Sequence, residues 1–231
     1  MTRSTKLIAI TGGIGCGKSV VSQLLRIMGF EVYDCDSRAK WVMTHDDLLR
    51  QQLITLFGEA TYLPDGSLNK PHLSASIFGN NEALAKMNAC VHPAVERDLR
   101  KQYEAYKEIT NYKLQVTDYR PFFFESAILF ESGFDKLSLP DEVWTISAPL
   151  ELRISRAIQR DHTTREQVLN RINSQMSQEE KEIRANHVIW NDPEHSVIEQ
   201  VNEIILPLPD ISSSTPDNTE ALPASAAHFR R

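Results

Sequence analysis

A run of eight residues near the amino terminus has the residue types and spacing of a phosphate-binding loop. It reads GGIGCGKS and matches G-x-x-x-x-G-K-[ST] at every required position. Glycines let the backbone wrap around phosphate oxygens with N–H groups pointing inward, and a helix beginning near Lys18 adds its positive end. Lys18 can reach the β- and γ-phosphates, and the Ser19 hydroxyl can bind Mg²⁺. The predicted nucleotide-binding residues of this segment are Gly12, Gly13, Ile14, Gly15, Cys16, Gly17, Lys18, Ser19 and Val20.

Two carboxylates, Asp34 and Asp36, follow a short predicted strand at residues 31–34. That position is the carboxyl edge of a parallel sheet, where ligands bind in α/β folds. A carboxylate there can accept the proton of an attacking hydroxyl or help to hold Mg²⁺. Either acid could instead cap the helix that begins near Ser37. Both roles are open, and the spacing does not distinguish which acid accepts the proton.

Four arginines cluster in two predicted helices late in the chain: Arg153, Arg156, Arg160 and Arg165. Arg156 and Arg160 are four residues apart and share a helix face. A mobile helical lid carrying arginines can close over a triphosphate, neutralise its charge and exclude water. The alternative is a solvated charged face that pairs with Glu151 and Asp161.

The elements that must position these residues follow from hydrophobic patterning. Strand, glycine turn, helix and strand at residues 6–34 form the βαβ unit of a doubly wound sheet. Further strands are predicted at residues 121–125, 142–147 and 187–190, and helices at 18–28, 150–160, 164–175 and 196–206. Residues 37–108 are mostly helical in pattern, with a turn at 63–67 and a second break at 91–93, where Pro93 is expected to open a helix.

The composition of the chain and the motifs that it lacks exclude several classes of function. The 231 residues carry a net charge of −6, which disfavours wholesale nucleic-acid binding. Three scattered cysteines, no signal-peptide pattern and no apolar stretch near the roughly 18 residues of a membrane span predict a cytoplasmic protein. The single Asn69-Lys70 pair lies in the helical stretch, so the guanine-reading N-K-x-D of a GTPase is missing. A small-molecule kinase remains the best fit.

The ordered motifs resemble those of the dephospho-CoA kinase family. IAIT with GGIGCGKS is similar to the family's opening, and YDCD with Arg38 is similar to its D-A-D-x-x-A-R segment. DGSL with IF at 77–78, MNACVHP at 87–93 and FESAILFE at 124–131 resemble further family segments. Arg156 with Arg160, Gln175, and ANHVI at 185–189 with Asn191 complete the pattern. The resemblance runs from about Lys6 to Asn191.

This resemblance implies an α/β P-loop NTPase fold with a five-stranded parallel sheet, flanking helices, a helical substrate-binding insertion and a helical lid. It implies ATP and Mg²⁺ as cofactors and transfer of phosphate to the ribose 3′-hydroxyl of dephospho-CoA, by a monomer or small homo-oligomer. Asp36 would be the catalytic carboxylate, and Lys18 and Arg156 would stabilise the transferring phosphoryl group. Arg160 and Asn191 would bind the nucleotide. The implied metal residues are Ser19, Asp34 and Glu125.

The corresponding domain boundaries place a nucleotide-binding core at residues 1–36, 112–150 and 184–206. A helical CoA-substrate domain is expected at 37–111, with His92 and Pro93 in it, a lid at 151–183 and a disordered tail at 207–231.

The chain departs from the family pattern at a few positions. Cys16 stands where serine is usual, and Asn186 replaces an aspartate. Glu125 replaces an aspartate and lengthens the arm by one methylene, which is tolerated if the carboxylate meets Mg²⁺ through water. Two alternatives are a nucleoside monophosphate kinase and a non-catalytic ATP-gated binding protein. The first would lack the DGSL and NACVHP segments, and Asp36 argues against the second.

The sparse apolar content after Pro207 generates a prediction about the tail. Truncation at about Leu206 should change neither melting temperature nor activity by much, because the tail lacks the apolar surface to join a core. Thermal unfolding and turnover of the two chain lengths check this. A fall of many degrees would show that the tail docks on the folded part.

Overall fold

Five short parallel strands form one sheet in the computed structural model, which describes residues 5–113 and 120–205. They are β1 (Leu7–Thr11), β2 (Val32–Asp34), β3 (Phe122–Glu125), β4 (Glu142–Ser147) and β5 (His187–Trp190). The order across the sheet is β2-β3-β1-β4-β5, and each neighbouring pair is parallel. The predicted five-stranded parallel sheet is therefore confirmed. The tail predicted at 207–231 lies outside the described residues.

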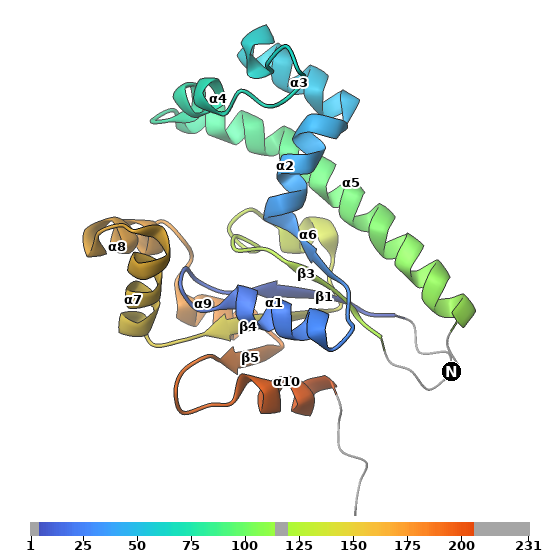
Figure 1. Ribbon diagram of the computed structural model, residues 1–231, viewed down its shortest axis with the longest axis vertical. Coiled ribbons are helices and arrows are strands. Elements are labelled where there is room, and N and C mark those ends of the chain that lie inside the picture. The colour runs from blue at the N-terminus through green and yellow to red at the C-terminus, as the bar shows by residue number, and fades with distance from the viewer. Residues whose placement is uncertain (1–4, 114–119, 206–231) are drawn as a thin grey trace, which may run out of the picture.

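Helices surround the sheet on both faces (Figure 1). Those of the first half are α1 (Lys18–Ile27), α2 (Cys35–His45), α3 (Asp47–Phe57), α4 (Lys70–Ile77) and α5 (Asn81–Lys113), with a 3₁₀ turn at Glu59–Thr61. Those of the second half are α6 (Phe134–Ser138), α7 (Leu150–Asp161), α8 (Arg165–Asn173), α9 (Gln178–Arg184) and α10 (Val197–Ile205). Among the described residues, no helix combines the length and apolar character needed to cross a membrane.

Alternation along the strands divides the core into two apolar layers. Ile8 and Ile10 of β1 point to one face, where Val21 and Leu25 of α1 cover them together with α10. Ala9 and the neighbouring strand residues point to the other face, which α2, α5 and α6 cover, and the same apolar cluster continues outward to α3. Because successive strand side chains alternate in direction, one strand contributes to both layers. The continuous apolar runs of these strands reflect burial on both faces.

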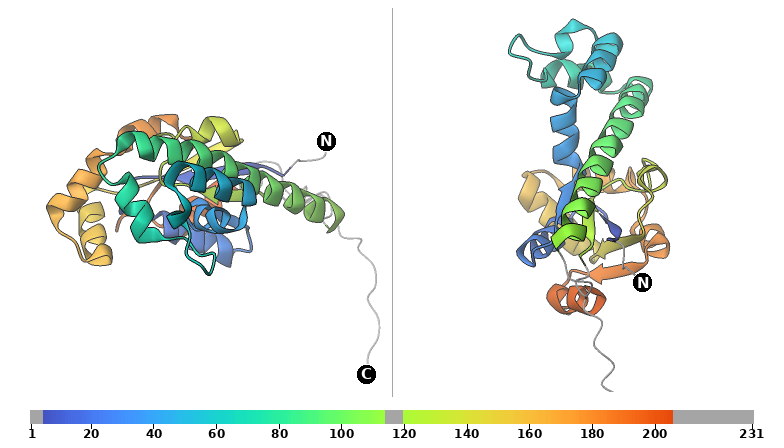
Figure 2. Two further views of the ribbon diagram at one scale, coloured as in Figure 1. Left: turned by 90° about the horizontal axis from the view of Figure 1, so that it is seen from above. Right: turned by 90° about the vertical axis from the view of Figure 1, so that its right-hand side faces the viewer.

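The helical insertion rises from one face of the sheet. Figure 1 shows α2 and α5 leading away from the strands to a distal group of α3 and α4, and the right-hand view of Figure 2 shows α2 and α5 side by side. All three of α2, α3 and α4 contact α5. The turn expected at residues 63–67 is present, with Gly66 at a φ of +82° and the Leu63 N–H donating to the Ser67 carbonyl.

The break expected at Pro93 is wrong, because α5 continues through this proline. Proline inside a helix removes one hydrogen bond and clashes with the preceding turn, at a cost of about 3 kcal/mol. The flanking Val91, Val95 and Leu99 are each at most 6% exposed. Burying such a side chain contributes about 1.5 to 3 kcal/mol, so tertiary packing outweighs the local signal.

A buried ion pair fixes α9 to the segment that follows β3. The Lys181 side chain is fully buried, and its Nζ lies 2.7 Å from Glu131 Oε1 and donates to the Ala127 carbonyl at 3.2 Å. Burial lowers the pKa of Lys181, and the hydrogen bond to Glu131 opposes that shift. The same carboxylate oxygen accepts from the Met176 N–H at 3.0 Å. The chain between α8 and α9 is therefore held at this point.

This ion pair predicts that removing only the Glu131 charge destabilises the fold more than removing both charges. Glu131→Gln should lower the free energy of unfolding by about 3 kcal/mol, because it leaves a buried ammonium without its counter-charge. Adding Lys181→Met should restore part of the loss, since it removes that charge. Urea denaturation of the single and double variants measures both effects.

The matched control is Glu82→Gln, which breaks the exposed Lys86–Glu82 pair. It should leave the urea midpoint nearly unchanged. Equal midpoints for Glu131→Gln and Glu82→Gln would contradict the prediction.

Candidate active site

The glycine-rich loop joins the carboxyl end of β1 to the first turn of α1, as the motif requires. Gly12 has a φ of +147°, and a Cβ there would lie 2.4 Å from the Ile146 carbonyl oxygen of β4. Gly17 has a φ of +94°, and a Cβ there would lie 1.9 Å from Nδ2 of Asn191. A Cβ at Gly12 would collide with the backbone of β4, and a Cβ at Gly17 would displace the side chain of Asn191, the residue after β5. The close course of the loop therefore depends on these two glycines.

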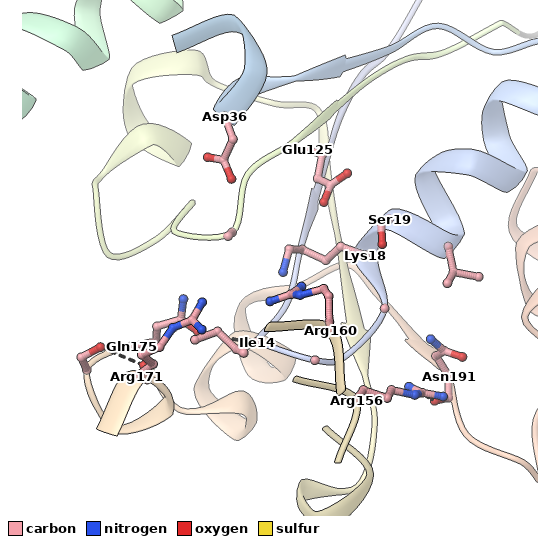
Figure 3. Close-up of a pocket in the computed structure, with 15 residues that line it drawn as sticks. Ile14, Lys18, Ser19, Asp36, Glu125, Arg156, Arg160, Arg171, Gln175 and Asn191 are labelled. Carbon is pink, nitrogen blue, oxygen red and sulfur yellow. Dashed lines mark hydrogen bonds between the residues drawn. The ribbon is translucent and has the colours of Figure 1, made fainter. Parts of the chain in front are cut away.

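The Lys18 side chain reaches from the start of α1 back over the loop. Its Nζ donates to the Gly12 carbonyl at 2.9 Å and to the Gly13 carbonyl at 3.3 Å. The ammonium is thus held over the loop that is expected to cradle phosphate, and Ser19 lies next to it in α1 (Figure 3). Asn191, at the end of β5, donates to the Cys16 carbonyl at 2.9 Å and fixes the loop from the other side.

A cavity of about 630 Å³ opens above the loop (Figure 3). It is lined by Ile14, Gly15, Gly17, Lys18, Ser19, Val20, Asp36, Glu125, Ala127, Arg156, Arg160, Arg171, Ser174, Gln175 and Asn191. Most of the predicted site residues are therefore brought together. Gly12, Gly13, Cys16 and Asp34 are the predicted ones that do not line it.

Two carboxylates reach this cavity from neighbouring elements. Glu125 ends β3, in register with Ile10 of β1 and Asp34 of β2, and its Oε2 accepts from the Ser22 hydroxyl at 2.6 Å. Asp36 is exposed in the first turn of α2. The sheet edge and the start of the helical insertion thus place one acid each at the same cavity.

Asp34 is occupied as a helix cap. Its Oδ1 accepts from the N–H groups of Asp36 and Ser37 at 3.0 and 3.2 Å, and its Oδ2 accepts from the Ser37 hydroxyl at 2.6 Å. The capping role that the sequence left open is therefore present. Through these bonds Asp34 sets the direction of the turn that carries Asp36.

Three arginines approach the cavity from the α7–α8 hairpin. Arg156 donates to the Asn191 carbonyl at 3.0 Å, which ties α7 to the end of β5. Arg160 and Arg171 both pair with Asp161, at 2.7 and 2.6 Å. Hydrogen bonds from Arg160 and then Arg171 hold the pKa of Asp161 well below its usual range. The exposed acid keeps two cations side by side at the cavity mouth.

The other two arginines of the predicted cluster lie elsewhere. Arg165 pairs with Glu151 at 2.6 Å on the outer surface, which is the solvated alternative for this residue. Arg153 is only 6% exposed, and its Nε donates to the Ile14 carbonyl at 3.0 Å. It supports the phosphate loop from beneath.

Several lining residues were missing from the sequence-based set. Arg171, Ser174, Gln175 and Ala127 all border the cavity. Gln175 carried a signal, because it belongs to the ordered pattern of the resemblance. Arg171 carried none, since a charged residue on an amphipathic helix is ordinarily solvated.

Over residues 5–113 and 120–205, no group of three or more His, Cys, Asp or Glu side chains could hold a metal by itself. Mg²⁺ does not need such a cage, because it binds through one or two oxygen ligands together with phosphates and water. The Ser19 hydroxyl and the Glu125 carboxylate supply oxygen donors of the right kind at one cavity.

Comparisons with known proteins agree with this geometry. A family model described as dephospho-CoA kinase matches residues 6–196. A dephospho-CoA kinase from Bacteroides fragilis is 43% identical over 199 residues, covering 86% of this chain and 90% of that protein. A dephospho-CoA kinase from Porphyromonas gingivalis is 39% identical, covering 86% of this chain and 92% of that protein.

Two solved structures share the fold. One, from Thermus thermophilus, has a TM-score of 0.71 at 32% identity and covers 89% of this chain and 98% of that chain. The dephospho-CoA kinase from Campylobacter jejuni has a TM-score of 0.60 at 24% identity and covers 86% of this chain and 96% of that chain.

The central place of Lys18 generates a prediction. Lys18→Ala should leave a folded protein whose turnover falls by orders of magnitude, because it removes charge stabilisation from a largely electrostatic reaction. Steady-state kinetics and thermal unfolding measure the two properties. Lys136→Ala, on α6 away from the cavity, is the control, and near-normal turnover of Lys18→Ala would refute the role of the loop.

Proposed function

The chain belongs to the dephospho-CoA kinase family, and on that premise we propose that Asp36, Lys18 and Arg156 carry its chemistry in the cavity above the phosphate loop. The reaction is ATP-dependent phosphorylation of the ribose 3′-hydroxyl of dephospho-CoA, giving CoA and ADP in the last step of coenzyme A biosynthesis. The alternatives of a nucleoside monophosphate kinase and an ATP-gated binding protein are not favoured, because the family and the relatives are dephospho-CoA kinases.

The observation that carries the residue assignment is the shared cavity. Asp36 lines the cavity that Lys18 and Arg156 also line, although it comes from the start of the helical insertion. In the view of Figure 3, Lys18 lies between Asp36 and Arg156. An acceptor hydroxyl at Asp36 and a triphosphate at Lys18 would therefore enter one space. This supports Asp36 as the group that accepts or orients the hydroxyl proton.

The cations have complementary tasks in this proposal. Lys18 and Arg156 neutralise charge that develops on the transferring phosphoryl group, and Arg160 and Asn191 contact the nucleotide. Because Arg156 is bonded to the Asn191 carbonyl, its position is linked to the strand end that also holds the loop. Arg160 can exchange its bond to Asp161 for phosphate oxygens when the nucleotide binds.

The residues present fit a magnesium ion. Ser19 and Glu125 would hold it, Glu125 through water because of its longer arm. The chemistry that it would supply there is neutralisation of the negative charge on the phosphate oxygens. Asp34 was predicted as a further metal residue, but its three hydrogen bonds in the α2 cap support a role in shaping the turn of Asp36.

The predicted division of the chain stays part of this proposal. Residues 1–36, 112–150 and 184–206 would form the nucleotide core, 37–111 the CoA-substrate domain and 151–183 the lid. We also propose action in the cytoplasm, as a monomer or small homo-oligomer without nucleic-acid partners. Net charge and the free cysteines support this setting.

Asp36→Asn tests the assignment. It should lower kcat at least about 100-fold with little change in ATP binding, because a positioned base contributes about 10² to 10⁴-fold. Coupled ADP release is measured with dephospho-CoA, AMP, UMP and no acceptor, beside an ATP-binding titration. The wild-type chain should release ADP quickly only with dephospho-CoA.

Asp34→Asn is the matched comparison. It should lose much less activity, since asparagine also caps helices well. A normally active Asp36→Asn beside an inactive Asp34→Asn would reverse the two roles, and rapid ADP release with AMP or UMP would contradict the substrate.

A further inference from the structure

The outer edge of the phosphate loop is held by side chains from the segment after β4. The Gly13 N–H donates to Gln178 Oε1 at 3.0 Å. The Ile14 N–H donates to Gln175 Oε1 at 3.3 Å, and both of these residues are labelled in Figure 3. The Ile14 carbonyl accepts from Arg153 Nε at 3.0 Å. The polar groups of this glycine-flanked edge are therefore paired before any phosphate arrives.

The hydrogen bond between Gly13 and Gln178 is buried, and the Gln178 residue is 8% exposed. Its Oε1 accepts from the Gly13 N–H, and its Nε2 donates to the Ile146 carbonyl at 3.2 Å. The pairing of β1 with β4 ends at Thr11 and Thr145, so one carboxamide continues the connection between the two strands where their own ladder stops. It sets the spacing between the loop and β4.

The element that carries Gln178 is firmly placed. Gln178 begins α9, three residues before Lys181 on the same helix, and Lys181 is buried against Glu131. A residue three positions away on a helix shares its face. The ion pair therefore fixes the face from which the carboxamide reaches the loop.

The loop tip also packs into the α7–α8 hairpin. The Ile14 side chain contacts a small apolar cluster built from Ile154, Ala157 and Val168. The backbone of the same residue is bonded to Gln175 and Arg153. Displacement of the loop edge would consequently disturb the hairpin that carries Arg156 and Arg160.

We propose that Gln178 is a positioning residue for ATP binding: its carboxamide fixes the course of Gly13 and Ile14, so that the nucleotide meets a preformed cradle. The inference rests on the proposed role of this loop in binding ATP. Glycine-rich backbone has high conformational freedom, and ordering it on binding would reduce affinity. Because Gln178 does not line the cavity of the phosphate loop, it acts through the backbone.

Gln178→Met tests this with a side chain of similar length and no hydrogen-bonding amide. The Kd for ATP from a direct titration, and the KM for ATP, should both rise about tenfold, the factor expected for one buried hydrogen bond. The kcat and the KM for dephospho-CoA should stay within about twofold, since the cost falls on ordering the loop before chemistry. Gln178→Asn, a milder change whose shorter arm cannot span both partners, should raise the Kd similarly and remains usable if Gln178→Met does not fold.

Asn186→Leu is the control for a purely structural amide. Asn186 Oδ1 accepts from the Val143 N–H at 2.8 Å, the same kind of contact to β4 at the opposite end of the strand. This variant should lower the melting temperature and leave the Kd for ATP unchanged.

These measurements distinguish failure of the positioning role of Gln178 from failure of the proposed function. If the folded Gln178 variants bind ATP as the wild-type chain does and lose only stability, as Asn186→Leu does, the positioning role is refuted while the proposed function stands. If the wild-type chain itself neither binds ATP nor releases ADP, the proposed function fails. A raised Kd for ATP with normal kcat supports the positioning role.

Discussion

The close passage of a bare backbone over the ends of two neighbouring strands is the constraint on which this molecule depends. Gly12 passes the Ile146 backbone carbonyl at a distance that excludes any Cβ, and a Cβ at Gly17, whose φ is +94°, would displace the Asn191 side-chain amide. This passage requires β1 to lie beside β4 in the sheet and β5 to lie on the other side of β4. It also explains why residues far apart in the chain, such as Cys16 and Asn191, hold each other in place.

Each face of the sheet positions a different part of the site. One apolar layer packs α1 and α10 and thereby fixes the helix that begins at Lys18. The other packs the helical insertion and thereby fixes α2, whose first turn presents Asp36. A bidentate pair from Arg38 to Asp98, joined by the Tyr33 hydroxyl, ties α2 to α5. Nucleotide and acceptor groups therefore meet at the edge where the two layers end.

Much of this arrangement could be predicted from the sequence, because its signals are local. The apolar runs of β1, β3, β4 and β5 and the spacing of GGIGCGKS need no knowledge of the rest of the chain. The continuation of α5 through Pro93 could not be predicted, since burial of side chains against α2 and α3 decides it. Likewise α9 gives no clear apolar periodicity, and the parts played by Gln178 and Lys181 arise from partners 30 or more residues away.

The roles of the carboxylates at the site could not be predicted from the sequence either. Asp34 and Asp36 are chemically identical in the sequence, and only the hydrogen bonds of the α2 cap separate the one that shapes the turn from the one that faces the cavity. Arg160 and Arg165 are likewise alike until their positions on the hairpin are known, one at the cavity and the other paired with Glu151 on the outer surface.

The uninterrupted course of α5 has a mechanical consequence. A helix of 33 residues extends about 50 Å at 1.5 Å per residue, from the distal helices past the amino end of β3, where Tyr103 and Tyr106 pack on Phe122. Because α3 and α4 pack against its distal half, a tilt of α5 about this aromatic contact would carry them with it. Asn81, at the start of α5, lies about 33 Å along the helix from Tyr103, so a tilt of about 5° at the aromatic contact would move the distal end by about 3 Å.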